Sequence, residues 1–173
     1  MIRTGTTLVV FAMLAAFAGA QGTKPPLTAA QQQQLFQRNR ATVAALVDSS
    51  LEISRSNDYV ARARSYRKVA MQLQRDLDHA AGDSDATRIA ELGSHLDTVL
   101  RQGLAPSLRA AHQQIGAGGT DRGNLLDIRD SSMELVDWLR TKAKDKWADT
   151  PEVRSVINSL EQTRKDLNGS VGP

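Results

Sequence analysis

Apolar residues recur every three or four positions along most of the chain after residue 28. That spacing places them on one side of an α-helix, which has 3.6 residues per turn. The alternation of apolar and polar residues that is typical of a β-strand is not found. The pattern predicts five helices, whose starts are expected near Thr28, Asn57 or Asp58, Ser84 or Asp85, Leu125 and Thr150. The sequence therefore predicts an all-α fold.

The first predicted helix, over about 28–53, has an apolar seam that we expect to face the core. Its members are Leu35 or Phe36, Val43, Leu46, Val47, Leu51 and Ile53. The polar stretch "SRSND" at 54–58 is rich in capping residues and should end this helix.

The next two predicted helices have seams that fit each other. Folding the chain back at the turn "GDSD" (82–85) pairs Leu77 with Ile89, Leu73 with Leu92, Ala70 with Leu96 and Tyr66 with Val99. One register thus serves every layer, as in an antiparallel helical hairpin. We therefore expect a hairpin over about 58–104 at the centre of a four- to five-helix bundle with seams of the coiled-coil type. The same register predicts ion pairs of Arg75 with Glu91 and of Lys68 with Asp97.

The remaining segments are expected to complete the bundle. Gly103 and Pro106 should kink or restart the third helix, which would continue from Ser107 to Ile115. Pro151, after the capping residue Thr150, fits the first position of a last helix. We expect residues 28–168 to form one helical domain and residues 169–173 to form a disordered tail.

The first twenty residues have the features of a secretory signal peptide. Arg3 supplies the positive charge, Thr6 to Ala18 form a short apolar run, and Ala18-Gly19-Ala20 resembles a cleavage site. We expect cleavage after Ala20, a periplasmic or secreted location, and a flexible lead over 21–27. The alternative is that the segment is retained as a membrane anchor, although the run is short for a bilayer.

Composition and charge narrow the classes of function. The chain has 173 residues, no cysteine and a formal net charge of +3, so disulfides and thiolate metal sites are excluded and nucleic-acid binding is not expected. Neither a G-x-S-x-G elbow nor a glycine-rich phosphate loop after a strand occurs. The sequence predicts a protein that is not an enzyme and uses no cofactor.

Glu91 and His95 are the best candidates for a metal site, and they are weak ones. They are four residues apart and share one helix face, which supplies half of a metal pair. A carboxylate-bridged site in a bundle needs Glu-x-x-His motifs and further inward glutamates, which are not found. We therefore predict no metal, and expect histidines that are exposed near helix ends.

The stretch "LTAAQ" at 27–31 has two interpretations. Thr28 and Gln31 have the spacing of a capping box, and Leu27 can pack against the first turns. Leu27, Thr28 and Gln31 also match an L-T-x-x-Q motif, so this stretch resembles periplasmic proteins of the Spy/CpxP type. That resemblance implies a small exported helical stress chaperone or sensor adaptor. A second L-T-x-x-Q motif, common in that family, is missing.

A longer stretch gives a second resemblance. "RIAELGSHLDTVLRQGLAPSLRAA", residues 88–111, is similar to uncharacterised exported all-helical bacterial proteins, which supports the compartment and the fold. We expect a non-catalytic interaction or scaffold protein with protein partners in the cell envelope, and the chaperone or adaptor is the alternative. The basic residues of 62–75 leave open a polyanion site, the segment 139–147 permits membrane contact without requiring it, and the helix faces leave open a homo-oligomer.

Overall fold

The computed structural model describes residues 28–116 and 119–172, and within these ranges every regular element is helical. The elements are α2 (Ala29–Arg55), α3 (Tyr59–Gly82), α4 (Ala86–Thr98), the π-helix η2 (Val99–Leu104), α5 (Ala105–Ile115), α6 (Arg122–Trp147) and α7 (Pro151–Asn168). Because α4, η2 and α5 follow one another without a break, the described residues form five helical rods. The predicted all-α bundle is confirmed.

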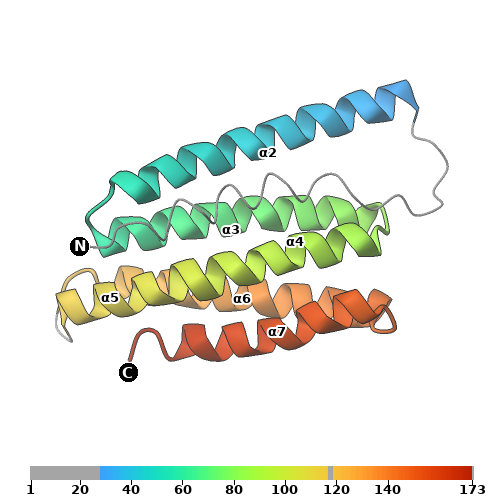
Figure 1. Ribbon diagram of the computed structural model, residues 1–173. Helices are drawn as coiled ribbons and strands as arrows, with labels where there is room; N and C mark the ends of the chain where they lie inside the picture. The colour runs from blue at the N-terminus through green and yellow to red at the C-terminus, as the bar shows by residue number, and fades with distance from the viewer. Residues whose placement is uncertain (1–27, 117–118, 173) are drawn as a thin grey trace.

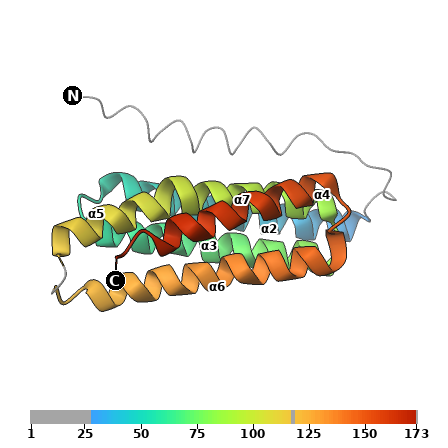
Figure 2. The ribbon, with the colours of Figure 1, turned by 90° about the horizontal axis from the view of Figure 1, so that it is seen from below.

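Four of the rods surround one core, and the fifth lies outside it. Figures 1 and 2 show α3, the α4–η2–α5 rod, α6 and α7 side by side, with α2 along the outer side of α3. The core includes leucines from all four rods, such as Leu73, Leu96, Leu139 and Leu160, each at most 3% exposed. The calls on residues 1–20 and 21–27 lie outside the described residues.

The helix starts follow local chemistry. The Asp58 carboxylate accepts hydrogen bonds from the backbone N–H groups of Val60 and Ala61, and Asp85 accepts one from Arg88. These bonds satisfy N–H groups that have no partner within the helix. Both caps were among the predicted alternatives, and they mark the starts of the two helices of the hairpin.

The central hairpin is confirmed, but its charge pairs are not. Residues that the register pairs, such as Leu77 and Ile89, are buried together between α3 and α4. The predicted ion pairs of Arg75 with Glu91 and of Lys68 with Asp97 were wrong. Lys68 instead pairs with Glu52 of α2 at 3.1 Å, Glu91 pairs with Arg88 at 3.3 Å, and Asp97 pairs with Arg101 at 3.5 Å. For each of these charged groups, an oppositely charged side chain on the same rod or on α2 is nearer than the one predicted across the hairpin.

The expected restart of the helix near Gly103 and Pro106 does not occur, because a wider turn joins α4 to α5. The chain stays helical from Ala86 to Ile115, and the Ala105 N–H donates to the carbonyl of Leu100, five residues earlier. Pro106 has no N–H to donate, and a π-helical turn moves its ring away from the preceding carbonyl groups. The Ser107 hydroxyl also donates to the Gly103 carbonyl at 2.8 Å. The backbone thus accommodates the proline without restarting.

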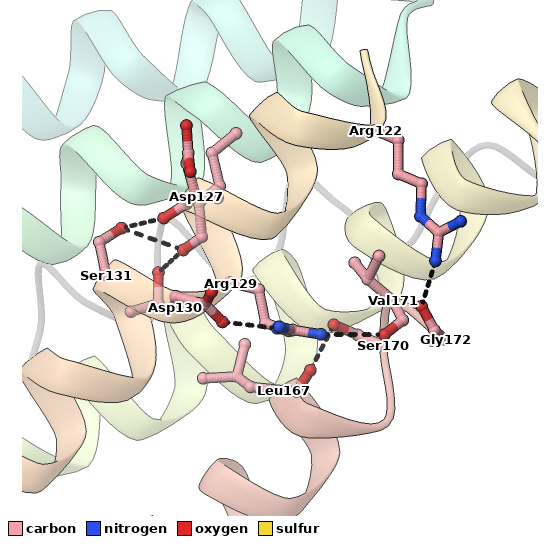
Figure 3. Close-up of polar contacts among 11 residues, drawn as sticks. Arg122, Asp127, Arg129, Asp130, Ser131, Leu167, Ser170, Val171 and Gly172 are labelled. Atoms are coloured by element: carbon pink, nitrogen blue, oxygen red, sulfur yellow. Dashed lines mark hydrogen bonds and ion pairs between the residues drawn. The ribbon is translucent and has the colours of Figure 1, made fainter. Parts of the chain in front are cut away.

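The end of the chain packs against the bundle up to Gly172, which corrects the expectation of a disordered tail over 169–173. Ser170 and Val171 are each 1% exposed. Figure 3 shows the guanidinium groups of Arg129 and Arg122 on α6 donating to the carbonyls of Val171 and Gly172, at 3.1 and 3.2 Å. The burial of Val171 and the hydrogen bonds to the two carbonyl groups hold this segment in place. Its glycines had suggested that it would fray.

A buried carboxylate joins α4 to α7. Asp97 is 6% exposed, and it accepts hydrogen bonds from Ser159, at 2.7 Å, and from Thr163. Arg101 supplies the neighbouring positive charge. A buried charge is tolerated when hydrogen bonds and an opposite charge surround it. This contact explains why Asp97, which the charge pattern placed on the surface, points inward.

Candidate interaction surface

Helix α2 differs from the other rods because, within residues 28–116 and 119–172, α3 is the only helix against which it packs extensively. Thr42 meets Asp76, and Glu52 meets Ser65, so the two helices are antiparallel. In this register Phe36 lies level with Gly82, the last residue of α3. The first turns of α2 therefore extend past the end of their neighbour, as Figure 1 shows.

Polar contacts fix the register of the interface between α2 and α3, beside half-buried apolar residues such as Leu46. The Thr42 hydroxyl donates to the Asp76 carboxylate at 3.0 Å, and both residues are buried. The Ser65 hydroxyl and the Lys68 ammonium both donate to Glu52, each at 3.1 Å. The buried bond between Thr42 and Asp76 contributes about 1 kcal/mol, less than the burial of a large apolar side chain. The attachment of α2 is therefore specific in register but weaker than the core.

An apolar stripe runs along the outward side of α2. Thr42, Leu46, Ser49 and Ile53 are buried or half-buried toward α3. Phe36, Val47 and Leu51, which we had expected in the inward seam, are instead 67%, 41% and 45% exposed. With the exposed Arg40 and Ala44 they span roughly 80° of the helix circumference. We call these five residues the α2 stripe.

The exposed large apolar side chains are concentrated on this side of the molecule. Within the described ranges, all of them belong to α2 or α3: besides the three in the stripe, these are Tyr59 and Met71. Single exposed apolar residues are ordinary on a soluble protein, but several on one peripheral helix are a common mark of a contact surface. The seam prediction failed because α2 has more apolar positions than one neighbour can cover.

A groove lies beside the stripe, between the C-terminal half of α2 and the start of α3. It is open, has a volume of about 750 Å³, and is lined by Asp48, Leu51, Glu52, Arg55, Ser56, Ala61, Arg64, Ser65 and Lys68. Three cationic side chains thus face two carboxylates around one exposed leucine. At one end of the groove, Arg62 holds the turn that joins α2 to α3. Its Nε donates to the Ser56 carbonyl at 2.8 Å, and its guanidinium lies over the Tyr59 ring. We call this feature the α2–α3 groove.

Glu52 organises the charges in the groove. Hydrogen bonds from Lys68 and Ser65, together with the Lys68 charge, hold the pKa of Glu52 below its ordinary value. Arg55 and Arg64 make no ion pair with any other described residue, and they leave positive charge at the groove. The groove can therefore accept a segment that combines an apolar side chain with negative charge.

The residues that the sequence singled out for chemistry lie elsewhere and do not form a site. His95 is half-buried on α4, where burial and the nearby charge of Arg88 lower its pKa, opposed by Glu91. Glu91 itself binds Arg88. Among the described residues, no group of three or more His, Cys, Asp or Glu side chains is placed to hold a metal ion.

The capping-box residues lie at the edge of the described structure. The Thr28 carbonyl accepts the Gln32 N–H at 2.9 Å, so α2 starts as predicted. Leu27 and the side chain of Gln31 are outside the described residues. The capping box and the L-T-x-x-Q motif therefore remain predictions.

The two tryptophans belong to the bundle. Trp138 and Trp147 are half-buried and pack against the core, and the ammonium groups of Lys142 and Lys146 lie 4.9 and 5.8 Å from their respective ring centroids. The two rings thus pack between the core and the lysine side chains of α6. No helix in the part of the chain that the structure describes is long and apolar enough to span a bilayer.

Comparisons with known proteins add no relative to this picture. No family model, no curated protein and no solved structure matches the chain.

Proposed function

We propose that this protein is an exported, non-catalytic interaction or scaffold protein that acts in the cell envelope through its α2–α3 side. The observation that carries the proposal is the exposure of Phe36, Val47 and Leu51 on a helix that has one extensive neighbour. The four-rod core supplies a rigid support, and α2 presents apolar and charged groups to a partner. The signal-like segment at 1–20 supports the compartment.

The distribution of perturbed groups supports binding more than catalysis. Catalytic sites usually gather groups with shifted pKa values in one cleft. In this chain Glu52 lines the open groove, Tyr66 has its pKa raised by burial against Gly103, and His95 lies on α4 beside Glu91. These three groups share no cavity, and the groove around Glu52 is suited to a peptide segment.

Capture of partners tests this proposal. The chain, purified with an affinity tag, is cross-linked in envelope extract beside an Arg55→Glu/Arg64→Glu variant, which reverses the charge of the groove. A matched control is Arg109→Glu, which changes an exposed arginine on α5. We expect the same acidic partner with the original chain and the control, and its loss with the groove variant. Absence of any bound protein, together with turnover in a panel of substrates, would overturn the proposal.

A stress chaperone or sensor adaptor is the second candidate. It is favoured by Thr28 in the L-T-x-x-Q motif and by the apolar α2 stripe, which could bind unfolded chains. Its test is the suppression of aggregation of a model client at equimolar amounts. A chaperone would protect the client and would lose that activity in a Val47→Gln/Leu51→Gln variant; no protection removes this candidate.

A further inference from the structure

Large exposed apolar residues stand at both ends of the α2 stripe, Phe36 at one end and Leu51 at the other. Phe36 and Leu51 are equally far from the midpoint between Val43 and Ala44, and so are Arg40 and Val47. The spacings of three and four residues are those of a coiled-coil seam. Two copies of such a stripe match when they lie antiparallel, because each apolar end then meets the other apolar end.

We propose that the α2 stripe binds a second copy of this chain, so that two α2 helices pair antiparallel about a two-fold axis near Ala44. The inference rests on the proposed function, since it names the partner of the stripe. Leu51 and Asp48, which also line the α2–α3 groove, would face the second copy. An interface of this kind is isologous: a contact made by one copy is repeated by the other.

Charge complementarity supports a second copy over an unrelated partner. In the antiparallel pair Arg40 faces Val47 of the second copy and lies next to Asp48 of that copy, and symmetry repeats the contact. Arg40 and Asp48 are both exposed, and neither makes an ion pair with another described residue of its own chain. In a parallel pair Arg40 would face Arg40, and like charges would repel.

The apolar contacts supply the driving force. Phe36 of one copy meets Leu51 of the other at both ends, and Val47 and Ala44 pack between them. These side chains are the ones that α3 leaves uncovered. Burying them against another helix removes apolar surface from water, while the two arginine–aspartate contacts fix direction and register.

Oligomeric state and charge reversal test the pairing. We expect the purified chain to have twice the mass of the single denatured chain in light scattering at submillimolar concentration. Arg40→Glu or Asp48→Lys alone should weaken the dimer about tenfold, because both symmetry-related contacts become repulsive. The double variant Arg40→Glu/Asp48→Lys should restore it, and Arg109→Glu is the matched control. Circular dichroism checks that each variant is folded.

Cysteine cross-linking tests the direction, and the absence of native cysteine makes it clean. Ala44→Cys should cross-link to itself near the axis. Gln33→Cys and Ser54→Cys, equally far from the midpoint between Val43 and Ala44, should cross-link when the two variants are mixed and hardly at all when each is alone.

Three results would overturn the inference: a monomer at all concentrations, a dimer that both single reversals leave unchanged, or cross-linking of Gln33→Cys to itself. The capture experiment decides the proposed function separately. A monomer that still binds a partner at the groove refutes only the pairing, and a dimer that binds nothing refutes only the function.

Discussion

The α4–α7 interface and the α2–α3 interface join pairs of helices by different means. At the first, Leu96 and Leu160 are fully buried, and Gly93 brings the helices so close that an added Cβ would lie 2.7 Å from Val156 Cγ1. At the second, Thr42, Ser49 and Glu52 contribute much of the contact. Both interfaces contain a buried carboxylate, yet Asp97 is bound by two hydroxyls and an arginine, and Asp76 is bound by one threonine.

This difference shows that one chain can combine a tightly packed apolar core with a peripheral helix whose outer face can contact a partner. Apolar burial stabilises the four-rod unit, whereas α2 is registered by hydrogen bonds and keeps apolar groups in solvent. Regions with few buried apolar contacts open at lower free energy than the core. Four predictions test this comparison, in order of decreasing effect.

The largest effect is expected from removing core leucine. Leu100→Ala should lower the free energy of unfolding by about 2–5 kcal/mol, because the side chain is fully buried and leaves a cavity. Leu51→Ala, on the exposed side of α2, should change it by less than about 0.5 kcal/mol when measured at a concentration at which the chain is a monomer. Urea unfolding of both variants measures the contrast. Equal losses would show that α2 is part of the core.

A close contact at Gly103 gives the next effect. An added Cβ there would lie 2.3 Å from Tyr66 Cε1, so Gly103→Ala should destabilise the fold by about 1–3 kcal/mol through overpacking. The control is Gly123→Ala, where nothing lies within 4 Å of the added atom and stability should hold or rise slightly. Thermal unfolding measures both. A neutral Gly103→Ala would mean that Tyr66 moves aside freely.

Hydrogen exchange tests the attachment of α2 directly. Thr42→Val removes the hydroxyl that binds the buried Asp76 carboxylate, so amides in α2 should exchange about fivefold faster, the equivalent of about 1 kcal/mol. Amides in α4 and α7 should be unaffected, whereas Thr163→Val, at Asp97, should act on those helices. The same acceleration in every helix would show that α2 opens only with the whole molecule.

The smallest effect concerns pH at the groove. The pKa of Glu52 is lowered in the folded chain, so ionised Glu52 stabilises the folded state. This stabilisation is complete above the ordinary pKa of a glutamate and is lost as pH falls through the lowered pKa. NMR titration should show Glu52 releasing its proton below the ordinary range, and Lys68→Ala should move the pKa back toward it. An unchanged titration in Lys68→Ala would remove Lys68 as the cause.

Much of the fold could be predicted from local residues. The capping residues Asp58 and Asp85 predicted the starts of their helices, and the matched apolar seams of 58–104 predicted the hairpin. The ion pairs of Arg75 and Lys68 could not be predicted, because long exposed side chains choose among several nearby partners of similar energy. The inward position of Asp97 depends on Ser159 and Thr163, which are more than sixty residues away in sequence.

The candidate surface was present in the sequence but could not be separated from the core pattern. Phe36, Val47 and Leu51 follow the same helical spacing as residues that turn inward. The one signal was an apolar arc on α2 wider than a single neighbour covers, together with the Thr42 and Ser49 positions in its packing face. Val171 was missed for the opposite reason, since one apolar residue among glycines has no periodicity.

The sequence by itself determined that the chain is helical, where its helices begin, and which two form a hairpin, since capping and 3.6-residue spacing act between near neighbours. Only the tertiary structure decided that four rods close the core and that α2 lies outside it. The physical reason is that burial depends on how many helices can surround one side chain. Because α3 packs against α4, α5 and α6, one side of α3 is left for α2, and the outer face of α2 lies in solvent.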